Sequence, residues 1–413
     1  MKTLYNKNML KIYVCGPTVY NDVHIGNIRP ILTYDLILKA ARNLGIEFSF
    51  IHNITDIDDK IINRAIEENT TEDEISTKYS KHYLEILKSL NVNTITHLEY
   101  VTKNLDTIYD LIQKMIDKGS AYKIGSNVWF DVNKNIENYG KVSNQQIDKM
   151  KFEDSDHQKR FPADFALWKD TNIGVKYNSP FGLGRPGWHT ECVALIYKHF
   201  KENGVDFHGG GMDLTFPHHE NENIQFFSIT GKDLSKNWLR TGQININGIK
   251  MSKSLQNVIL PKDFIEAYSA DHLKVIFLLS NLTSEINIDE NLLNNASLFL
   301  KKIKKIFFEA TINKIDRNYD EDLFKQAMSY IFEKNFSKFN KLLNELFKEI
   351  NKNNSKIYMA TIMKIFDSLE FDISKFNYKD YVDLYNQWQS HLRNKNFVDA
   401  DKVRETLIKN ELI

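Results

Sequence analysis

Two short polar segments of this chain carry residue types that handle phosphate groups. One is His24-Ile25-Gly26-Asn27, which follows an apolar, strand-like run, and the other is Lys250-Met251-Ser252-Lys253-Ser254, far along the chain. His24 and Asn27 can donate hydrogen bonds to phosphates. The lysines of the second segment can neutralise the charge that develops when a phosphoryl group is transferred. Together, the two segments indicate ATP chemistry of the kind that activates a carboxylate as an acyl-adenylate.

Each segment alone also has an ordinary structural explanation. The lysine pentad follows Asn247-Gly248, as a solvated basic turn would. Asn27 precedes the apolar run Ile31-Leu32-Leu36-Ile37, as a residue that caps a helix would. The order and wide separation of the two segments favour the chemical interpretation over these explanations.

A second group of side chains has the chemistry of a metal site. Cys15 ends an apolar run, Cys192 falls in a predicted helix, and His218 and Glu222 stand four residues apart. That spacing places an imidazole and a carboxylate on one face of a helix. Two thiolates, an imidazole and a carboxylate together suit zinc.

Alternatives to this metal site remain at the level of sequence. A cysteine is often a small buried apolar residue, and His218 with Glu222 could form a solvated helix face. His219 competes with His218 as a ligand, but the residue four positions after it, Asn223, binds zinc poorly. All the candidate ligands flank the predicted ligand crevice, which favours the metal interpretation.

The elements that position these residues begin with two predicted strands and a helix. The sequence predicts two buried strands, Lys11–Cys15 and Phe48–Ile54, and a helix between them, Ile31–Leu44. This order predicts a βαβ unit and a parallel sheet. Ligands of such sheets bind beyond the carboxyl ends of the strands, and His24 and Thr55 fall at that edge.

Later segments predict a return to the sheet and then a helical bundle. We expect a strand over Val205–His208 that leads into Gly209-Gly210-Gly211, and a helix over His218–Ile229. From Glu290 onward the apolar periodicity predicts helices with short polar loops. These helices are Leu292–Ala310, Leu323–Asn351, Ile357–Phe371, Tyr381–Arg393 and Val398–Lys409.

Composition limits the class of protein. The 413 residues suffice for two to four domains. The counts of 54 basic and 54 acidic residues give a formal net charge of zero, so any nucleic-acid binding must use a local basic face. Two cysteines do not make a secreted disulfide framework. No apolar run approaches the ~18 residues of a membrane span, and the start lacks a signal-peptide pattern. We therefore expect a cytoplasmic protein without membrane contact.

A series of ordered motifs resembles those of cysteinyl-tRNA synthetases, a family of class I aminoacyl-tRNA synthetases. The resemblance covers residues 10–290 closely and the helical remainder more loosely. The matching segments are Tyr13–Tyr20, His24–Asn27, Asn53–Lys60, Arg185–Cys192, His208–Leu214, Phe216–Glu222 and the lysine pentad. Asn27 stands where class I enzymes generally carry a second histidine, and it keeps a hydrogen-bond donor there.

The resemblance implies an α/β fold: a Rossmann-type parallel-sheet catalytic domain with an inserted connective segment, followed by an all-α helical bundle domain. Residues 1–104 would form the first half of the catalytic domain, 105–165 the connective insertion, and 166–247 the second half with the zinc site. Residues 248–290 would hold the pentad loop and a stem-contact region, and 291–413 the helical tRNA- and anticodon-binding domain.

The resemblance also implies roles for single residues. One zinc ion per chain would be held by Cys15, Cys192, His218 and Glu222 and would bind the thiolate of substrate cysteine. The amino-acid pocket would include Thr55, Trp188 and Asp213. ATP, as its magnesium complex, would be bound by His24, Asn27, Gly209, Gly210, Asp213 and Lys253. Catalysis would use His24, Asn27, Lys250 and Lys253. The implied partners are tRNA(Cys), cysteine and ATP, and we expect a monomer.

Two alternatives stay open. One is a cysteine:amino-sugar ligase of low-molecular-weight thiol biosynthesis, which resembles the same catalytic core. The other is a catalytically inactive tRNA-binding paralogue. The intact pentad and the full metal set favour an active enzyme. Residues 301–356 hold 13 Lys and Arg against 8 Asp and Glu, a mild excess that is as consistent with a solvated helix face as with a surface that contacts a phosphate backbone.

Overall fold

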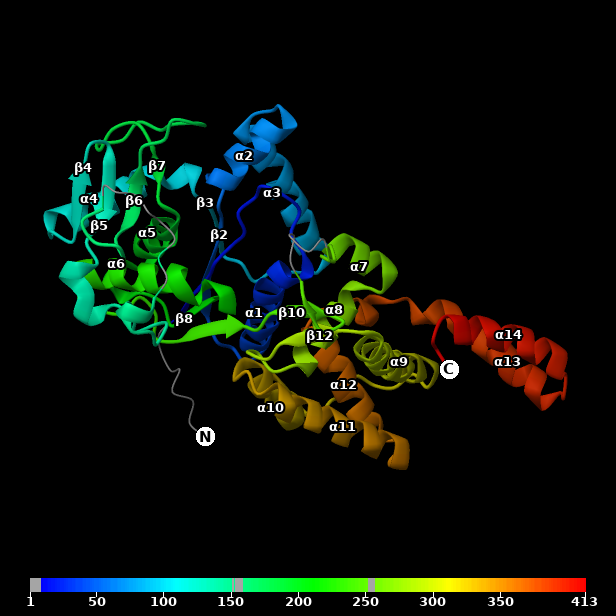
Figure 1. Ribbon diagram of the computed structural model, residues 1–413. Helices are drawn as coiled ribbons and strands as arrows, with labels where there is room; N and C mark the ends of the chain where they lie inside the picture. Colours follow the sequence, from blue (N-terminus) through cyan, green and yellow to red (C-terminus); the bar gives the residue numbers. More distant parts are fainter. Residues whose placement is uncertain (1–8, 151, 153–158, 252–256) are drawn as a thin grey trace. The chain divides into compact units, whose positions relative to one another are not determined.

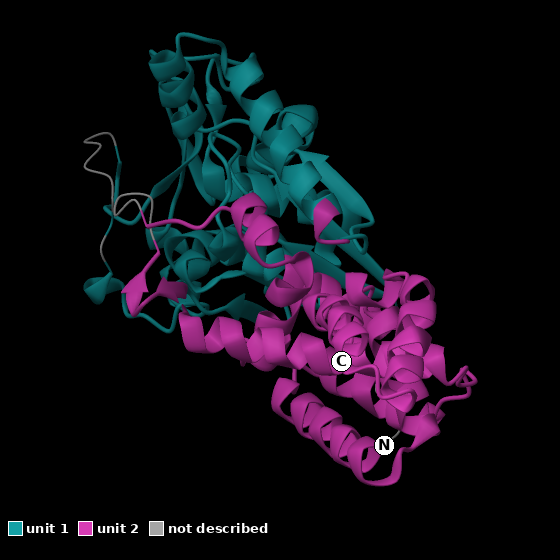
Figure 2. Ribbon diagram, turned by 90° about the vertical axis from the view of Figure 1, so that its right-hand side faces the viewer, with its two compact units in different colours: residues 1–31, 47–88, 92–243 teal, residues 32–46, 89–91, 244–413 magenta. Residues whose placement is uncertain are grey.

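The computed structural model describes residues 9–150, 152, 159–251 and 257–413 (Figure 1). The chain packs as two compact units, which Figure 2 colours separately. Unit 1 comprises residues 1–31, 47–88 and 92–243, and unit 2 comprises residues 32–46, 89–91 and 244–413. Helix α1, Ile25–Asn43, therefore begins in unit 1 and ends in unit 2.

Unit 1 is built on a parallel sheet whose strand order is β3-β2-β1-β8-β9. Every neighbouring pair in it is parallel, which confirms the predicted Rossmann-type sheet. Strand order reverses between β1 and β8, and ligands of open α/β sheets bind at such a switch point. The strands are β1 Leu10–Val14, β2 Phe48–Ile54, β3 His97–Tyr100, β8 Phe207–Gly211 and β9 Trp238–Thr241.

The sequence of β1 explains its central place in the sheet. Leu10, Ile12, Tyr13 and Val14 are all buried, so the strand is apolar on both faces, as a strand covered by helices on both sides must be. Its register sets Tyr13 between Ile51 of β2 and His208 of β8. The residue that follows the strand, Cys15, thereby lies at the carboxyl edge of the sheet.

Helices and a smaller sheet complete unit 1. The helices are α2 Asp59–Glu68, α3 Glu72–Ser89, α4 Leu105–Asp117, α5 Trp188–Phe200 and α6 Glu220–Thr230. The smaller sheet is antiparallel, with strands β4 Ala121–Ile124, β5 Asn127–Phe130, β6 Phe165–Lys169 and β7 Arg185–Pro186. Asp58 caps α2, since its side chain accepts a hydrogen bond from the backbone amide of Lys60 at 2.8 Å.

Two predicted boundaries near the glycine run were wrong. The predicted strand Val205–His208 is β8, which instead runs on through the glycines, because their backbones keep pairing with β9 as far as Gly211 and Thr241. The predicted helix His218–Ile229 begins only at Glu220. The preceding Thr215–His219 forms a π-helical turn in which Phe216 is extended.

Unit 2 is largely helical, which confirms the predicted helical C-terminal region. Its later helices are α7 Pro261–Ala267, α8 Ala270–Leu279, α9 Glu290–Ile312, α12 Lys356–Ser368, α13 Val382–Arg393 and α14 Phe397–Lys409. A small sheet joins β11 Ile249–Lys250, β10 Ile244–Ile246 and β12 Ile286–Ile288. No helix within the described ranges is long and apolar enough to cross a membrane.

The predicted helix Leu323–Asn351 is in fact two helices, α10 Glu321–Phe332 and α11 Phe336–Asn353. The chain breaks at Lys334, whose φ of 59° lies in the left-handed region. Asn335 then caps α11, because its side chain accepts from the amide of Lys338 at 3.3 Å. The asparagine in the middle of the apolar pattern was the available signal for this break.

His52, in the centre of β2, is a buried histidine whose protonation state follows from its contacts. Its Nδ1 lies 2.8 Å from the carbonyl oxygen of Val14 and therefore donates to it. Its Nε2 lies 2.8 Å from the hydroxyl of Tyr83 and accepts from it. Burial lowers the pKa of His52 to about 4, although the Val14 carbonyl opposes this shift.

We expect this histidine to make stability depend on pH. Below pH ~6.5 the unfolded chain protonates His52, whereas the folded protein keeps it neutral down to about pH 4. Stability is therefore lost as the pH falls through this window, by about 2 kcal/mol at pH 5. Urea unfolding at pH 7 and pH 5 should show a smaller loss for His52→Gln than for the wild-type chain. Equal losses of stability in the variant and the wild-type chain would show that His52 does not cause the pH dependence.

Candidate functional site

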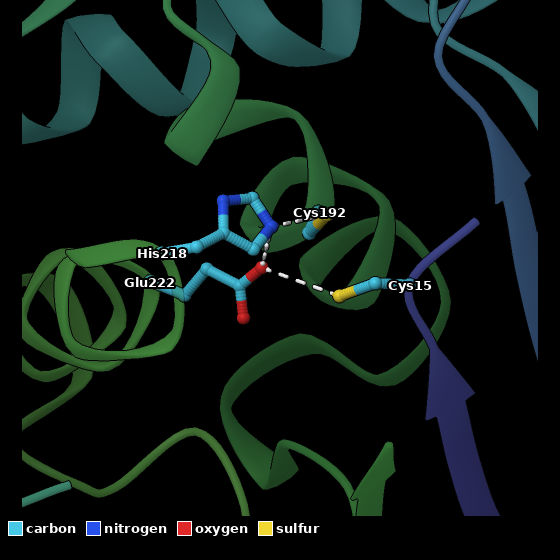
Figure 3. A group of neighbouring side chains, drawn as sticks. All are labelled: Cys15, Cys192, His218 and Glu222. Carbon is cyan, nitrogen blue, oxygen red and sulfur yellow. Dashed lines mark hydrogen bonds and ion pairs between the residues drawn. The ribbon is translucent and has the colours of Figure 1, made fainter. Parts of the chain in front are cut away.

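Four side chains converge beyond the carboxyl end of β1 (Figure 3). Cys15 follows β1, Cys192 lies in α5, His218 lies in the π-helical turn, and Glu222 lies in α6. Their donor atoms all lie within 4.8 Å of one another. Nε2 of His218 is 2.8 Å from Oε1 of Glu222 and 3.6 Å from Sγ of Cys192, and Sγ of Cys15 is 3.7 Å from Oε1 of Glu222. The fold thus gathers the four residues that the sequence predicts as ligands.

The size and chemistry of this cluster fit one tetrahedral ion. Zinc binds sulfur at ~2.3 Å and nitrogen or oxygen at ~2.0–2.2 Å, so donors around one ion lie ~3.5 Å apart. Cys192, His218 and Glu222 are buried, whereas Cys15 is only partly buried. The cluster is therefore enclosed on most sides, with its more open side at Cys15.

Electrostatics of the cluster favour a bound cation. Burial lowers the pKa of His218, but the Glu222 carboxylate and the Cys192 thiol outweigh it and raise that pKa to about 10. Burial raises the pKa of Glu222, but His208 and His218 outweigh it and hold that pKa well below its usual range. A metal ion that binds here would replace the imidazole proton and meet an ionised carboxylate.

A second group, formed by Cys15, His208, His219 and Glu222, is equally tight, with donor atoms within 4.8 Å of one another. This second group is a poorer metal site because of His219. Nε of Arg240 donates to Nδ1 of His219 at 3.0 Å, so the neutral ring carries its proton on Nε2, the atom that faces Cys15 at 3.7 Å. A protonated nitrogen cannot coordinate a metal, and the group with His218 is favoured.

His218 is held in the orientation that a ligand needs. Its Nδ1 lies 3.0 Å from Nδ1 of His189. Burial lowers the pKa of His189 to about 3, so that ring is neutral and its Nδ1 can accept a hydrogen bond from the Nδ1–H of His218. A metal-binding histidine usually donates a hydrogen bond from its second nitrogen in this way, and Nε2 of His218 is then the nitrogen that an ion would bind in place of the proton.

Trp188 covers the cluster from the start of α5. Its ring stacks on the ring of His218, with centroids 4.1 Å apart and planes at 23°, and 38% of the residue is exposed. It also lines a cavity of about 360 Å³. Trp188, predicted from the resemblance to line the amino-acid pocket, is thus in contact with one predicted metal ligand, His218.

Thr55, the buried member of the predicted pocket, is fixed by a chain of hydrogen bonds. Its hydroxyl accepts from the side-chain amide of Asn53 and donates to Glu191, both at 3.1 Å. Oδ1 of Asn53 accepts in turn from the hydroxyl of Tyr13 at 2.9 Å and from the amide of Gly16 at 2.8 Å. A Cβ atom at Gly16 would lie 1.6 Å from the carbonyl oxygen of Asn53, so this close approach requires glycine.

His24 and Asn27 form the start of α1. Nδ1 of His24 accepts from the amides of Gly26 at 3.1 Å and Asn27 at 3.3 Å, and Oδ1 of Asn27 accepts from the amide of His24 at 3.1 Å. The two side chains therefore cap the helix reciprocally, with His24 before its first residue and Asn27 inside its first turn. The N-terminus of a long helix attracts anions such as phosphate.

The remaining predicted residues lie in different settings. Gly209 and Gly210 are buried in β8, and Asp213 is exposed in the short turn Met212–Leu214 that follows. Lys250 is exposed at the end of β11 in unit 2. Lys253 lies outside the described residues.

Comparisons with known proteins show the family of this chain. The family model described as "tRNA synthetases class I (C) catalytic domain" matches residues 1–298. The chain is 43% identical over 408 residues to the cysteine–tRNA ligase of Mesomycoplasma hyopneumoniae strain 232, covering 98% of both chains. It is 40% identical over 443 residues to the cysteine–tRNA ligase of Mycoplasma mycoides subsp. mycoides SC, covering 100% of this chain and 98% of that protein. The chain belongs to the cysteine–tRNA ligase family.

A solved structure supports the fold of this cysteine–tRNA ligase family member. The LeuRS of Agrobacterium radiobacter K84, in a ternary complex with tRNA and LeuAMS, matches with a TM-score of 0.67 at 8% sequence identity, covering 89% of this chain and 85% of that one. At so low an identity the likeness concerns the arrangement of helices and strands alone.

Sequence reasoning missed several polar residues around the cluster of this ligase family member. His189 and Arg240 orient the two candidate histidines, and Nε2 of His208 lies 2.7 Å from Oε2 of Glu222. Glu191 binds Thr55. Three of these residues lie inside the motifs that carry the resemblance: His189, Glu191 and His208. Their place in those motifs could have indicated that they belong to the site. Arg240 comes from β9, where its sequence offered no such signal.

Proposed function

We propose that this protein ligates cysteine to tRNA(Cys) at the expense of ATP, through a cysteinyl-adenylate. The observation that carries the proposal is the convergence of Cys15, Cys192, His218 and Glu222 beneath Trp188, in a chain that matches cysteine–tRNA ligases along nearly its whole length. Thiolates, an imidazole and a carboxylate are ligands for a metal ion that can in turn bind a thiolate, and the similar chains are cysteine–tRNA ligases.

We further propose that the cluster holds one zinc ion. Bound by Cys15, Cys192, His218 and Glu222, zinc would supply a soft Lewis acid that favours the thiolate of cysteine over the hydroxyl of serine. Shape alone separates two such near-isosteres only weakly, by ~10 to 200-fold. His189 and His208 would hold the imidazole and the carboxylate in place, and Trp188 would cover the bound amino acid.

In the first step, a carboxylate oxygen of cysteine attacks the α-phosphorus of ATP, and the bond to pyrophosphate breaks. The protein's contribution is to position the reactants and stabilise charge. The capped N-terminus of α1, with His24 and Asn27, supports the phosphates from one side. Lys250 and Lys253 would neutralise the leaving pyrophosphate, and Gly209 and Gly210 leave room for the nucleotide, with Asp213 nearby.

In the second step, the terminal adenosine of tRNA attacks the carbonyl carbon of the adenylate, and AMP leaves. Class I membership predicts the 2′-hydroxyl as the attacking group. We propose residues 105–165 as the connective insertion of a catalytic domain whose halves are residues 1–104 and 166–247. Residues 248–290 would be the stem-contact region and residues 291–413 the tRNA- and anticodon-binding domain. A monomeric state and a cytoplasmic location stay predictions.

One assay pair tests the function. Cysteine-dependent exchange of pyrophosphate into ATP measures the first step, and transfer of labelled cysteine to tRNA(Cys) measures the second. We expect both activities, with serine at least ~100-fold less effective than cysteine. An absence of exchange would indicate the inactive paralogue. Exchange with transfer to an amino sugar, and none to tRNA, would indicate the thiol-biosynthesis ligase.

A further inference from the structure

Glu191 is a buried carboxylate at the edge of the substrate cavity. It lies in the first turn of α5, directly before Cys192, and 1% of it is exposed. It lines the cavity of about 360 Å³ together with Trp188 and His189. A carboxylate taken out of water is costly unless a cation or several donors compensate it. The groups that contact Glu191 therefore indicate whether its carboxylate is structural or binds a ligand.

Those partners leave the carboxylate incompletely compensated. One oxygen, Oε2, accepts from the hydroxyl of Thr55 at 3.1 Å. Among the residues that the structure describes, no lysine, arginine or histidine forms an ion pair with Glu191, and Thr55 is its one hydrogen-bond donor. Burial accordingly raises the pKa of Glu191, and the hydrogen bond from Thr55 offsets this rise only in part. One neutral hydroxyl is much less than a buried carboxylate normally requires.

The basic side chains that line the same cavity are occupied elsewhere. Lys169 and Arg185 both form ion pairs with Asp59. Lys159 lies over the ring of Trp129, with Nζ 5.6 Å from its centroid. The cavity thus offers a carboxylate that these bases do not neutralise.

The orientation of Glu191 is fixed from the opposite side. The Thr55 hydroxyl that donates to it accepts from Asn53, and Asn53 is held by the Tyr13 hydroxyl. This buried chain spans β1, β2 and α5 and sets the carboxylate before any ligand enters. Preorganisation of this kind is typical of a binding group.

We propose that the Glu191 carboxylate receives the α-ammonium group of the substrate amino acid, with Thr55 holding the carboxylate in place. The inference rests on the proposed function. Cysteine carries its thiol and its ammonium on adjacent carbons, and Glu191 adjoins Cys192, a proposed ligand beside the substrate thiolate. The ammonium would pair with this carboxylate and favour its ionised form, and a ligand without an ammonium leaves Glu191 with Thr55 as its one partner among the described residues.

The test compares cysteine with 3-mercaptopropionate, which has the thiol and the carboxylate but no ammonium. In cysteine-dependent pyrophosphate exchange, the KM for cysteine should lie ~10 to 100-fold below the inhibition constant of the analogue. Glu191→Gln keeps the size and an acceptor oxygen for Thr55. We expect it to raise the KM for cysteine ~10 to 100-fold and to change binding of the analogue less than about threefold. Glu191→Asp should retain most of the preference.

Glu220→Gln is the matched control. Glu220 is also fully buried in unit 1, but it accepts from the backbone amides of Gly140, Val142 and Ser143. Its substitution should lower the unfolding temperature and leave the preference for cysteine over the analogue unchanged.

Two outcomes would overturn the inference. A wild-type protein that binds both ligands equally has no ammonium site, and this measurement needs no variant to fold. A Glu191→Gln variant that weakens both ligands by the same factor, or neither, would give Glu191 a structural role alone. Either result, obtained together with normal pyrophosphate exchange by the wild type, would contradict the role of Glu191 and not the proposed function. The proposed function would be contradicted only if the wild type showed no cysteine-dependent exchange.

Discussion

Cys192→Ser is expected to remove the metal from the purified protein and, with it, the activation of cysteine. The substitution replaces a soft thiolate by a hydroxyl that stays protonated, in a buried cluster where Sγ lies 3.6 Å from Nε2 of His218. Loss of a group that only orients a ligand already costs ~10 to 100-fold in metal affinity, so loss of a ligand should cost at least as much. Zinc content measured by mass spectrometry should fall from one ion per chain to well below one.

Ala194→Ser is a suitable control for this change. Ala194 is buried in the same helix, α5, two residues after Cys192, so its side chain points about 200° around the helix from that of Cys192. The control should retain its zinc. Unchanged zinc content in Cys192→Ser, or full activity of metal-free wild-type protein, would remove this cluster from the proposed mechanism.

Lys253→Ala should abolish most adenylate formation while cysteine still binds. A lysine that neutralises the leaving pyrophosphate acts in the transition state, and loss of one such stabilising group costs ~100 to 1,000-fold in rate. The kcat of cysteine-dependent exchange should therefore fall by this factor, while the affinity for cysteine, measured without ATP, changes less than about twofold.

Lys262→Ala controls for the loss of one positive charge nearby in sequence. Lys262 is exposed in the first turn of α7, and its removal should leave both quantities unchanged. A Lys253→Ala variant with weakened cysteine binding and normal turnover at saturation would contradict the role given to this lysine.

The sequence predicted the parallel sheet and the ligand set for clear physical reasons. Strands such as Lys11–Cys15 are apolar on both faces because helices cover both sides of the sheet, and that pattern is local. The spacing of His218 and Glu222 survives the π-helical turn between them, since their donor atoms still meet at 2.8 Å. Cys15 and Cys192 were predicted as ligands from their chemistry, but their spacing was weak evidence because only tertiary folding brings them together.

Other features depended on contacts that no local pattern encodes. The choice between His218 and His219 follows from Arg240, a residue of a neighbouring strand that fixes the tautomer of His219. Because glycines are typical of loops, the sequence predicted that the strand ends before Gly209–Gly211. The structure extends β8 through these glycines because they pair with β9. The inference about Glu191 depends on its having one hydrogen-bond donor and no ion-pair partner among the described residues. A sequence does not show which side chains surround a buried carboxylate.

The pairing of β1 with β8 has a consequence for how this protein is made. Lys11 of β1 and Asp206, which precedes β8, are joined by a hydrogen bond although they stand 195 residues apart. At ~5–20 residues per second, a ribosome needs roughly 10 to 40 seconds to supply the partner. Throughout that interval the nascent chain carries an apolar strand with one unpaired edge, which is a template for association with other chains. Chaperone occupancy during translation should therefore be highest before residue 211 emerges and fall sharply after it.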